Sequence, residues 1–195
     1  MREYKKENSI VFSKTREPFG EFSNMCSGFE LIINGIELQS SEVLYQALKF
    51  SSHPEIQEEI INTKNSMMAK KVAYKYPELM DPNWDKIKVK IMKMCLHIKH
   101  MQHFEILQPI FKISNGMNIV EYSKTDRFWG CTYSQDTSTY IGTNALGRLL
   151  MELRVISISA KEIHFVPLYN FPELYLLGES IGKKINKDGS TSEHV

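Results

Sequence analysis

The sequence predicts an α+β fold that is mostly α-helical, a compact single domain with a few short strands that include an N-terminal β-hairpin. Between residues 41 and 113, apolar side chains recur every three or four positions, as they do on one face of a helix. Asn34-Gly35 joins two short apolar runs and is the strongest local signal for a hairpin turn. The length of 195 residues, with 42% hydrophobic content, supplies one sizeable core and is short for two domains.

The chain before residue 41 is expected to hold the short strands. Residues 9–13 favour a strand, and residues 14–24 favour a loop because Pro18 and Gly20 interrupt regular structure. Residues 29–39 form the predicted hairpin, since asparagine and glycine both tolerate the positive φ angles of a tight hairpin turn.

Helices are expected from an N-cap at Ser40 or Ser41 onward. The predicted helices cover residues 41–52, 55–62, 65–76, 84–99 and 102–113. In the fourth of these, apolar residues at helical spacing are separated by lysines, which is typical of a core helix with a solvated basic face. A basic stripe on this helix is formed by Lys86, Lys88, Lys90 and Lys93. It is a solvated face or, alternatively, a contact for a phosphate backbone.

Beyond residue 113 the pattern is more mixed. Residues 118–123 favour a strand, residues 124–144 a polar loop, and residues 144–157 a second strong helix. Residues 162–171 favour a strand, and residues 172–184 a short helix with Pro172 in its first turn. The tail from about Asn186 is polar and is expected to be disordered.

Composition excludes several classes of protein. The net charge of +1 gives no strong overall field that would attract nucleic acid or a membrane surface. Cys26, Cys95 and Cys131 are odd in number and widely spaced, which argues against a zinc site or a disulfide framework and favours reduced thiols in the cytoplasm. No apolar run approaches the ~20 residues of a membrane span, so no membrane partner is expected.

The segment SSEVLYQALKF, residues 40–50, is the first candidate for a functional site. Glu42 and Lys49 are seven positions apart, so on a helix they share a face with only ~20° of drift, and Tyr45 and Gln46 lie between them. This face either lines a pocket or meets solvent, with the glutamate placed where the helix dipole favours a negative charge.

Two further segments carry candidate chemistry. Asp126, Trp129 and Gly130 combine a carboxylate, a large ring and a flexible backbone in a polar loop, which suits either a stacking platform or a loop anchored to the core. Gly147 and Arg148 lie near a predicted helix N-terminus, which can bind phosphate through free backbone N–H groups, although the glycine alone also permits close helix packing.

A metal site is not expected from the histidines. His97, His100 and His103 are three residues apart, which spreads them over ~120° of a helix, whereas zinc-binding pairs on one helix more often use a spacing of four. We therefore expect them to be surface or packing residues.

Five segments in order resemble one family. They are FGEFSN (19–24), SSEVLYQALKF (40–50), NWDKIKVKIMKMCLHIKHMQH (83–103), EYSKTDRFWG (121–130) and GTNALGRLLMELR (142–154). Together they resemble the NADAR, or YbiA-like, domain over residues 9–156. Residues 157–195 lie outside the resemblance and are expected to form a C-terminal extension.

The resemblance implies a compact, mostly helical α+β domain that cleaves N-glycosidic bonds without a cofactor or metal. The substrates it implies are phosphorylated intermediates of riboflavin biosynthesis, which are pyrimidine-ribose compounds, or ADP-ribose attached to guanine in nucleic acid, as DarT-type toxins leave it. The family motifs match this chain at Phe22, Ser23, Asn24, Glu42, Gln46, Lys49, Trp84, Asp126, Trp129, Gly130, Asn144, Leu146 and Gly147. All of these except Leu146, together with Tyr45 and Arg148, are the expected site residues.

Glu42, Lys49 and Asp126 are the expected catalytic residues. Breaking a C1′–N bond builds positive charge on the sugar, which a carboxylate stabilises or relieves by orienting water. A neutral lysine can instead attack C1′ and form a Schiff base. Lys49 is thus a nucleophile or a charge partner, Glu42 and Asp126 share the acid, base and stabilising roles, and Trp129 holds the base.

The chain also departs from the family pattern. Val43 stands where the family usually has histidine, and the spacer between Gly130 and Gly142 lacks the expected glycines. These departures leave open an alternative, a module that binds ADP-ribose or a related nucleotide without cleaving it.

Overall fold

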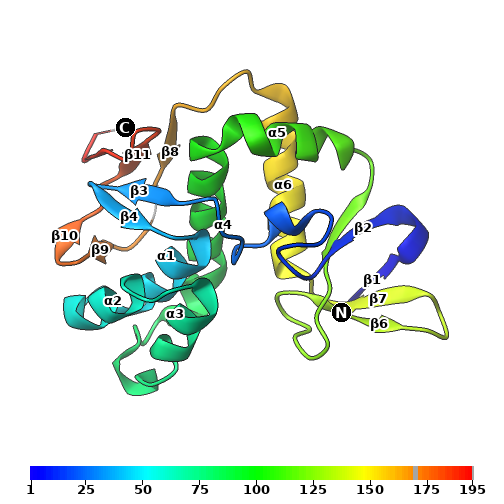
Figure 1. The fold of residues 1–195 in the computed structure, drawn as a ribbon, viewed down its shortest axis with the longest axis horizontal. Coiled ribbons are helices and arrows are strands. Elements are labelled where there is room, and N and C mark those ends of the chain that lie inside the picture. The colour runs from blue at the N-terminus through cyan, green and yellow to red at the C-terminus, as the bar shows by residue number, and fades with distance from the viewer. Residues whose placement is uncertain (169–170, 195) are drawn as a thin grey trace. The chain divides into compact units, whose positions relative to one another are not determined.

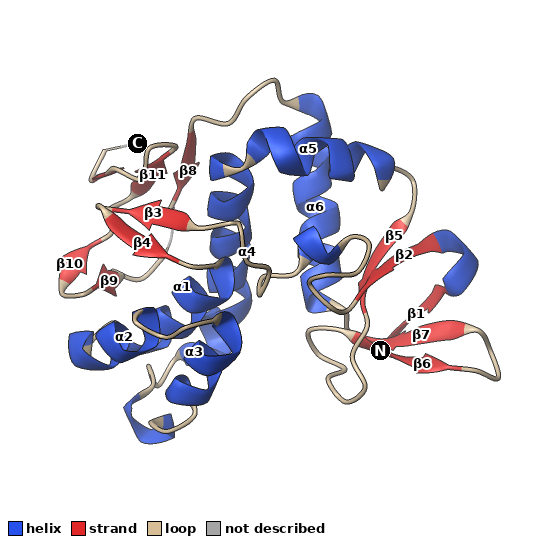
Figure 2. Ribbon diagram, viewed as in Figure 1, coloured by secondary structure: helices blue, strands red, loops and turns tan. Residues whose placement is uncertain are grey.

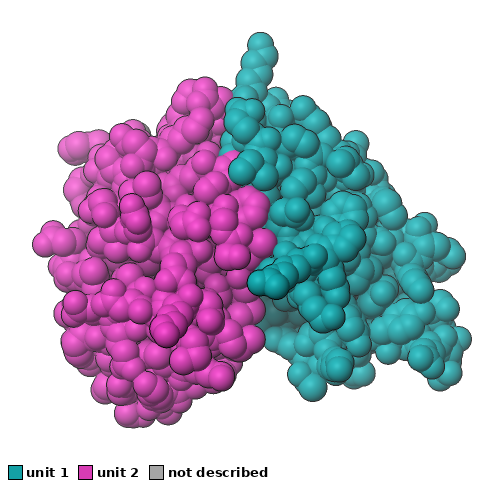
Figure 3. All heavy atoms as spheres, in the orientation of Figure 1, with its two compact units in different colours: residues 1–23, 104–161 teal, residues 24–103, 162–195 magenta. Residues whose placement is uncertain are grey.

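The computed structural model describes residues 1–168 and 171–194 (Figure 1). Helices hold 41% of the residues and strands 20%, which confirms the predicted α+β, mostly helical class. The chain divides into two compact units, unit 1 with Met1–Ser23 and Phe104–Lys161 and unit 2 with Asn24–His103 and Glu162–Val195 (Figure 3). Each unit therefore combines two stretches that are far apart in the sequence.

Unit 1 combines two helices with five strands and two short 3-10 turns. Its elements are β1 (Arg2–Lys5), η1 (Lys6–Asn8), β2 (Ser9–Phe12), η2 (Gly20–Phe22), α5 (Phe104–Ile113), β5 (Asn118–Glu121), β6 (Cys131–Ser134), β7 (Thr139–Gly142) and α6 (Ala145–Ser159). The strands form an antiparallel sheet in the order β1-β7-β6 and a separate parallel pair, β2 and β5. Helix α6 packs against β5 and α5.

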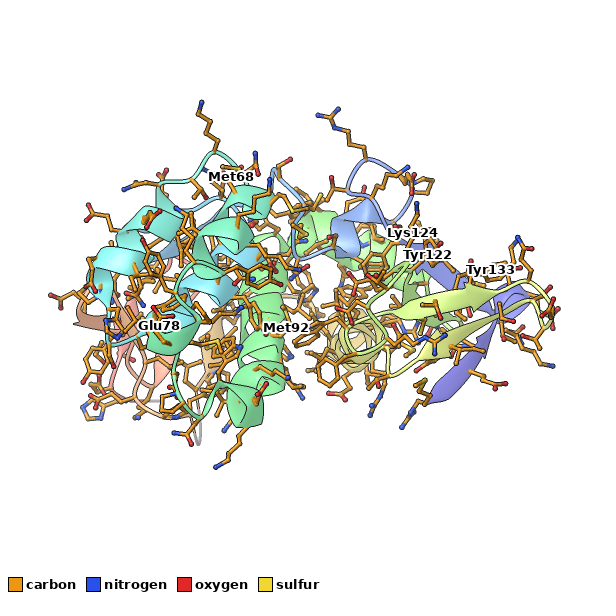
Figure 4. All side chains as sticks on the ribbon, turned by 90° about the horizontal axis from the view of Figure 1, so that it is seen from below. Met68, Glu78, Met92, Tyr122, Lys124 and Tyr133 are labelled. Atoms are coloured by element: carbon orange, nitrogen blue, oxygen red, sulfur yellow. The ribbon has the colours of Figure 1, made fainter. Side chains whose placement is uncertain are left out.

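The sheet of unit 1 has its own apolar cluster. Tyr4, Val120, Cys131 and Tyr140 form its buried part. Tyr122 and Tyr133, which are labelled in Figure 4, pack against it. Each of the three strands contributes a side chain to this cluster, so the sheet is held by packing as well as by its ladder.

Unit 2 is built around the long helix α4. Its elements are β3 (Leu31–Ile33), β4 (Ile36–Leu38), α1 (Ser41–Ala47), η3 (Leu48–Phe50), α2 (Pro54–Ile61), α3 (Ser66–Ala73), η4 (Pro77–Leu79), α4 (Trp84–Gln102), β8 (Phe165–Pro167), β9 (Tyr175–Leu176), β10 (Glu179–Ser180), β11 (Lys184–Asn186) and β12 (Thr191–Ser192). Helix α1 packs against α2, α3 and α4, and α4 also contacts β3 and β8 (Figure 2). All seven residues of α1 are buried as a result.

The predicted hairpin is confirmed, and its turn has the expected geometry. β3 and β4 pair antiparallel, and the turn residues Asn34 and Gly35 have φ angles of 50° and 77°. Both values lie in the left-handed region that a two-residue hairpin turn requires. The five helices predicted between residues 41 and 113 are also present as α1 to α5, with the first shortened to Ser41–Ala47 and continued by η3.

Three predictions after residue 123 are wrong. The segment 124–144 contains the β6–β7 hairpin in place of a continuous loop, and 172–184 contains the β9–β10 hairpin in place of a helix. In the second hairpin, Leu177 and Gly178 adopt φ angles of 52° and 85°, which form a tight turn that no helix can accommodate. The tail expected to be disordered contains β12, which pairs with β11. The predicted strand at 162–171 appears as β8, and residues 169 and 170 of that segment lie outside the described residues.

No helix in the described part of the chain combines the length and the apolar character that crossing a membrane requires.

Candidate active site

The N-terminus of α1 is fixed by hydrogen bonds from both sides. Ser40 caps the helix, because its hydroxyl accepts from the backbone N–H of Val43 at 3.3 Å. The carbonyl of Asn24 accepts from the backbone N–H of Glu42 at 2.9 Å and from the hydroxyl of Ser41 at 3.1 Å. Glu42 is therefore held at a defined position in the first turn.

The carboxylate of Glu42 is buried and bonded to two side-chain amides. Gln46 donates to Oε1 at 2.6 Å, and Asn24 donates to Oε2 and also contacts the sulfur of Met92 on α4. Only 4% of Glu42 is exposed. Burial raises the pKa of Glu42 above its ordinary value, and the Gln46 bond and the charges of Lys70 and Lys49 oppose this rise. A carboxyl group in these surroundings keeps its proton to a higher pH than an exposed glutamate does.

Lys49 lies on η3, and its amine is surrounded by aromatic rings. Nζ lies 5.5 Å from the ring centroid of Tyr45, 5.6 Å from that of Tyr74 and 5.7 Å from that of Trp84. The residue is only 9% exposed. Burial lowers the pKa of Lys49 to about 8, the negative charge of Glu42 opposes this, and nearby lysine charges add to it. Such an amine is partly neutral near physiological pH, which nucleophilic attack requires.

Trp84 and a short loop complete the surroundings of Lys49. The ring centroids of Trp84 and Tyr45 are 5.0 Å apart, and Trp84 is the first residue of α4. The loop before α4 is bonded to η3, because Asp81 donates its N–H to the carbonyl of Lys49 at 2.8 Å. Residues 49–53 and 78–83 line a pocket of about 400 Å³ beside this loop. One of the lining residues, Glu78, is labelled in Figure 4. The polar face of α1 is thus buried, so the solvent-exposed interpretation of this helix is wrong, and Lys49 on η3 also lines the pocket.

Asp126 organises the loop that carries Trp129. Its Oδ1 accepts from the backbone N–H groups of Phe128 at 2.8 Å and Trp129 at 2.9 Å, and its own N–H donates to the hydroxyl of Ser123 at 3.0 Å. This is the turn that aspartate forms with its own backbone. Gly130 follows where a Cβ atom would lie 2.6 Å from the carbonyl oxygen of Glu121 on β5, so only glycine fits this contact. Asp126 therefore has a structural role in this loop, whatever else it does.

The N-terminus of α6 is occupied by backbone partners. Ala145 and Leu146 donate their N–H groups to the carbonyls of Phe128 and Trp129 at 2.9 and 3.0 Å. Two of the N–H groups that a phosphate would need are already used. Arg148, one turn into the helix, is half-buried.

Asn144 and Gly147 join α6 to β5. The Asn144 side chain donates to the carbonyl of Ile119 at 2.8 Å and accepts from the N–H of Glu121 at 3.1 Å. A Cβ on Gly147 would lie 2.1 Å from the carbonyl oxygen of Ile119. This favours the packing interpretation of Gly147 and gives Asn144 the same function.

Phe22 and Ser23 occupy buried positions. The Phe22 ring packs on those of Phe12, Phe19 and Phe111, with centroids 6.1, 6.2 and 4.9 Å away. Ser23 is also buried and directly precedes Asn24 in the chain. Phe22 is therefore a core residue of unit 1.

The structure brings together one half of the predicted site. Unit 2 gathers six of the predicted residues along α1 and the η3 turn that follows it: Asn24, Glu42, Tyr45, Gln46, Lys49 and Trp84. Asp126, Trp129 and the residues at the start of α6 belong to unit 1. The convergence of Asp126 with Glu42 and Lys49 stays a prediction.

Lys70 and Tyr74, both from the α3 segment, are neighbours of this site that the sequence did not reveal. Tyr74 contributes one of the three rings around Lys49, and the charge of Lys70 influences both Glu42 and Lys49. Their spacing of four residues puts them on one face of a helix, but only the packing of α3 on α1 brings that face to Lys49. For metals, the described residues hold no cluster of three or more potential ligands.

The comparisons with known proteins agree on one family. The NADAR domain matches residues 11–156. The N-glycosidase YbiA of Escherichia coli (strain K12) is 31% identical over 145 residues, which cover 74% of this chain and 86% of that protein. The N-glycosidase Npun_R5314 of Nostoc punctiforme is 30% identical over 153 residues, 75% of this chain and 90% of that protein.

Two further matches extend the comparison. The chloroplastic riboflavin biosynthesis protein PYRR of Zea mays is 31% identical over 161 residues, 75% of this chain but 25% of that protein. The NMR structure of the E. coli protein YbiA superposes with a TM-score of 0.65 at 28% identity and covers 80% of this chain and 91% of that one. On the strength of the domain match over most of its length and of these relatives, the chain belongs to the NADAR domain family.

Proposed function

We propose that this protein is an N-glycosidase that hydrolyses the bond between C1′ of a phosphorylated ribose and a nitrogen of its base. The observation that carries the proposal is that α1 and η3 hold a buried carboxyl group, Glu42, and a buried amine, Lys49, whose pKa is lowered to about 8 and which lines a pocket. The names of the relatives in Escherichia coli and Nostoc punctiforme support the same chemistry.

Lys49 acts as the nucleophile in the covalent version of the mechanism. Its neutral amine attacks C1′ while the base leaves with the electrons of the C1′–N bond and takes up a proton. Loss of the amine proton and opening of the ribose ring give a Schiff base, which water hydrolyses to free the sugar and restore the lysine. With a pKa of about 8, roughly one tenth of Lys49 is neutral at pH 7.

The carboxylate of Glu42 can stabilise the positive charge that develops on the sugar in either version of the mechanism. In the direct version it orients the attacking water and stabilises the positive charge that develops on the sugar, and Lys49 serves as its charge partner. Asn24 and Gln46 hold the carboxylate in one orientation through their amide groups. The amides thereby pre-organise the carboxyl group before substrate binds.

We also propose roles for residues of unit 1. Asp126 is assigned to acid–base chemistry or charge stabilisation, and Trp129 is assigned to stacking on the base. Arg148 is assigned to phosphate binding, whereas the buried residues Gly130, Asn144 and Gly147 act indirectly, by holding the Trp129 loop and α6 against β5. The ring of Trp129 is partly exposed, as a stacking platform must be.

Two substrate classes share the required bond and a phosphorylated ribose. The relative named for riboflavin biosynthesis supports a phosphorylated pyrimidine-ribose intermediate of that route. The family resemblance also implies ADP-ribose on guanine in DNA or RNA, where the lysines of α4 would contact the phosphate backbone.

An activity panel with a trapping step tests the proposal. The protein is incubated with ADP-ribosylated DNA, RNA and nucleoside and with the riboflavin intermediates, with and without borohydride, and released base and protein mass are measured. We expect release of base from one class, a sugar adduct on Lys49, and a loss of about 10²- to 10⁴-fold in kcat for Glu42→Gln. No release from any substrate contradicts the proposal, and tight binding of ADP-ribose without release points to a binding module. Full activity of Lys49→Ala with no adduct removes the lysine from the mechanism.

A further inference from the structure

The exposed aromatic ring of Tyr74, which lies beside Lys49, also contacts a second lysine, Lys70. Tyr74 follows α3 and is 64% exposed, in contrast to the buried rings of Tyr45 and Trp84. The amine of Lys49 lies 5.6 Å from its ring centroid, and the amine of Lys70 lies 5.8 Å from the same centroid. Lys70 precedes Tyr74 by four residues, so the two side chains share one face of the helix. The exposed ring of Tyr74 thus contacts one buried amine, that of Lys49, and one half-buried lysine, Lys70.

In the described part of the chain, some lysines of unit 2 are in ion pairs, and Lys49 and Lys70 are not. Lys75 is paired with Glu59 at 2.6 Å and Lys88 with Asp85 at 2.7 Å. Within residues 1–168 and 171–194, no carboxylate lies within ion-pair distance of Lys49 or Lys70. The charge of Lys70 lowers the pKa of Lys49, so the two amines repel each other, and a bound anion relieves that repulsion.

We propose that Lys70 binds the phosphate of the phosphorylated ribose, next to the exposed face of Tyr74, while C1′ of the same sugar faces Lys49. The orientation of C1′ rests on the proposed function, whereas phosphate recognition by Lys70 rests only on the lysine pair and the ring. Lysine binds phosphate as a compact point charge with three donors, and an exposed ring beside it limits where the anion can sit. Both candidate substrate classes carry this phosphate, the riboflavin intermediates as a monoester and ADP-ribose as a pyrophosphate.

The electrostatic reach of Lys70 supports this assignment. Its charge opposes the rise in the pKa of Glu42 and contributes to the lowered pKa of Lys49. A phosphate on Lys70 is thus near enough to the two groups to belong to the same substrate. Lys71, the next residue on α3, is exposed and provides a control with the same loss of charge on the same helix.

Calorimetric titration with ribose 5-phosphate, ADP-ribose and unphosphorylated ribose tests the proposal. We expect Lys70→Ala to weaken the binding of ribose 5-phosphate by about tenfold or more, the equivalent of one lost charged contact. Lys71→Ala should bind within about twofold of the wild type, and Lys70→Arg should retain most of the affinity. If Lys70→Ala weakens the binding of ribose 5-phosphate alone, Lys70 recognises the monophosphate class of substrate. If it weakens the binding of ADP-ribose equally, Lys70 also recognises the pyrophosphate class. Thermal melting of each variant checks that it is folded.

Several results contradict the assignment. Unchanged binding in Lys70→Ala, an equal loss in Lys71→Ala, or no preference of the wild type for ribose 5-phosphate over ribose each overturn it. Failure of the proposed function has a different signature, because Lys70-dependent phosphate binding without any base release refutes only the glycosidase. Conversely, base release with the same KM in Lys70→Ala and wild type refutes only the role of Lys70.

Discussion

Lys49 and Glu42 have opposite responses to the same burial. Loss of water lowers the pKa of the amine to about 8 and raises the pKa of the carboxyl group, so burial favours the neutral form of both groups. For the lysine, the unfolded chain binds more protons between about pH 8 and its ordinary value of 10.5, so this residue makes stability rise across that window. For the glutamate, the folded chain keeps its proton above the ordinary value of 4.5, so its contribution falls as the pH rises past that value.

The pH dependence of kcat/KM should follow the titration of the Lys49 amine. If neutral Lys49 attacks the sugar, kcat/KM rises about tenfold per pH unit below about pH 8 and levels off above it. Initial rates between pH 6 and about 9.5 measure this, with Lys71→Ala as a control that should keep the wild-type profile. A flat profile across this range argues for direct attack by water, because that route has no need of a neutral lysine.

The same residues show how far the sequence alone predicts the site. The spacing of Glu42 and Lys49 placed them on one helical face, but it did not decide between solvent and interior. That choice depended on α2, α3 and α4 covering α1, which is a property of tertiary packing. Lys70 and Tyr74 were invisible for the same reason, since their own helix is unremarkable and becomes relevant only through what it packs against.

At the level of elements, the junction of α6 with β5 depends on close backbone contact. The side chain of Asn144 bonds the backbone of β5 on both sides of Val120, and Gly147 leaves room for the carbonyl of Ile119. Glycine normally weakens a helix by about 1 kcal/mol relative to alanine, but here the missing Cβ is what allows the two elements to approach.

Gly147→Ala should therefore destabilise the protein despite the better helix propensity of alanine. The added carbon meets a backbone oxygen that cannot move without shifting β5, so we expect a loss of about 1–3 kcal/mol in the free energy of unfolding. Urea denaturation measures the change. Val155→Ala, at an exposed position of the same helix, should stay within about 0.5 kcal/mol of wild type. Equal stability of Gly147→Ala and wild type would show that β5 tolerates the shift.

The hairpins that sequence reading missed have a common cause. β6 and β7 contain residues that favour strands, such as Cys131, Thr132 and Tyr140. The serines, aspartate and glutamine around them made the whole segment look like a polar loop. The β9–β10 hairpin was missed because Pro172 suggested a helix start, while the Leu177-Gly178 turn gives only half of the usual signal. Long, strongly periodic helices such as α4 were predictable because their signal is repeated over many turns.

On the scale of the whole molecule, residues 162–195 are integral to unit 2. Gln57 on α2 is fully buried, and its side chain bonds the carbonyl of Tyr175 at 2.8 Å and the N–H of Leu177 at 2.7 Å. The hairpin residue Asn34 donates its N–H to the carbonyl of Gly189 at 2.9 Å. Tyr175, Leu177 and Gly189 lie after residues 11–156, which match the family domain, so a segment outside the matched range contributes contacts to unit 2.

Removal of residues 162–195 should lower the stability of the remaining protein. The truncation leaves the amide of Gln57 with one hydrogen bond and uncovers the surface of α4 that β8 packs against. Each buried polar group left without its partner costs about 1–3 kcal/mol, so we expect a clear fall in Tm by calorimetry. A chain ending at residue 192 retains every strand and should melt as the full chain does. A truncated protein with unchanged Tm would show that the segment is an accessory.

Because each unit combines an earlier stretch of the chain with a later one, neither can be completed early during synthesis. Strand β1 at Arg2–Lys5 pairs with β7 at Thr139–Gly142, so it leaves the ribosome more than a hundred residues before its partner. For most of translation it is an open edge available to neighbouring nascent chains. The strand is short, and three of its four residues are charged, which disfavours pairing of that edge with other chains before β7 is synthesised.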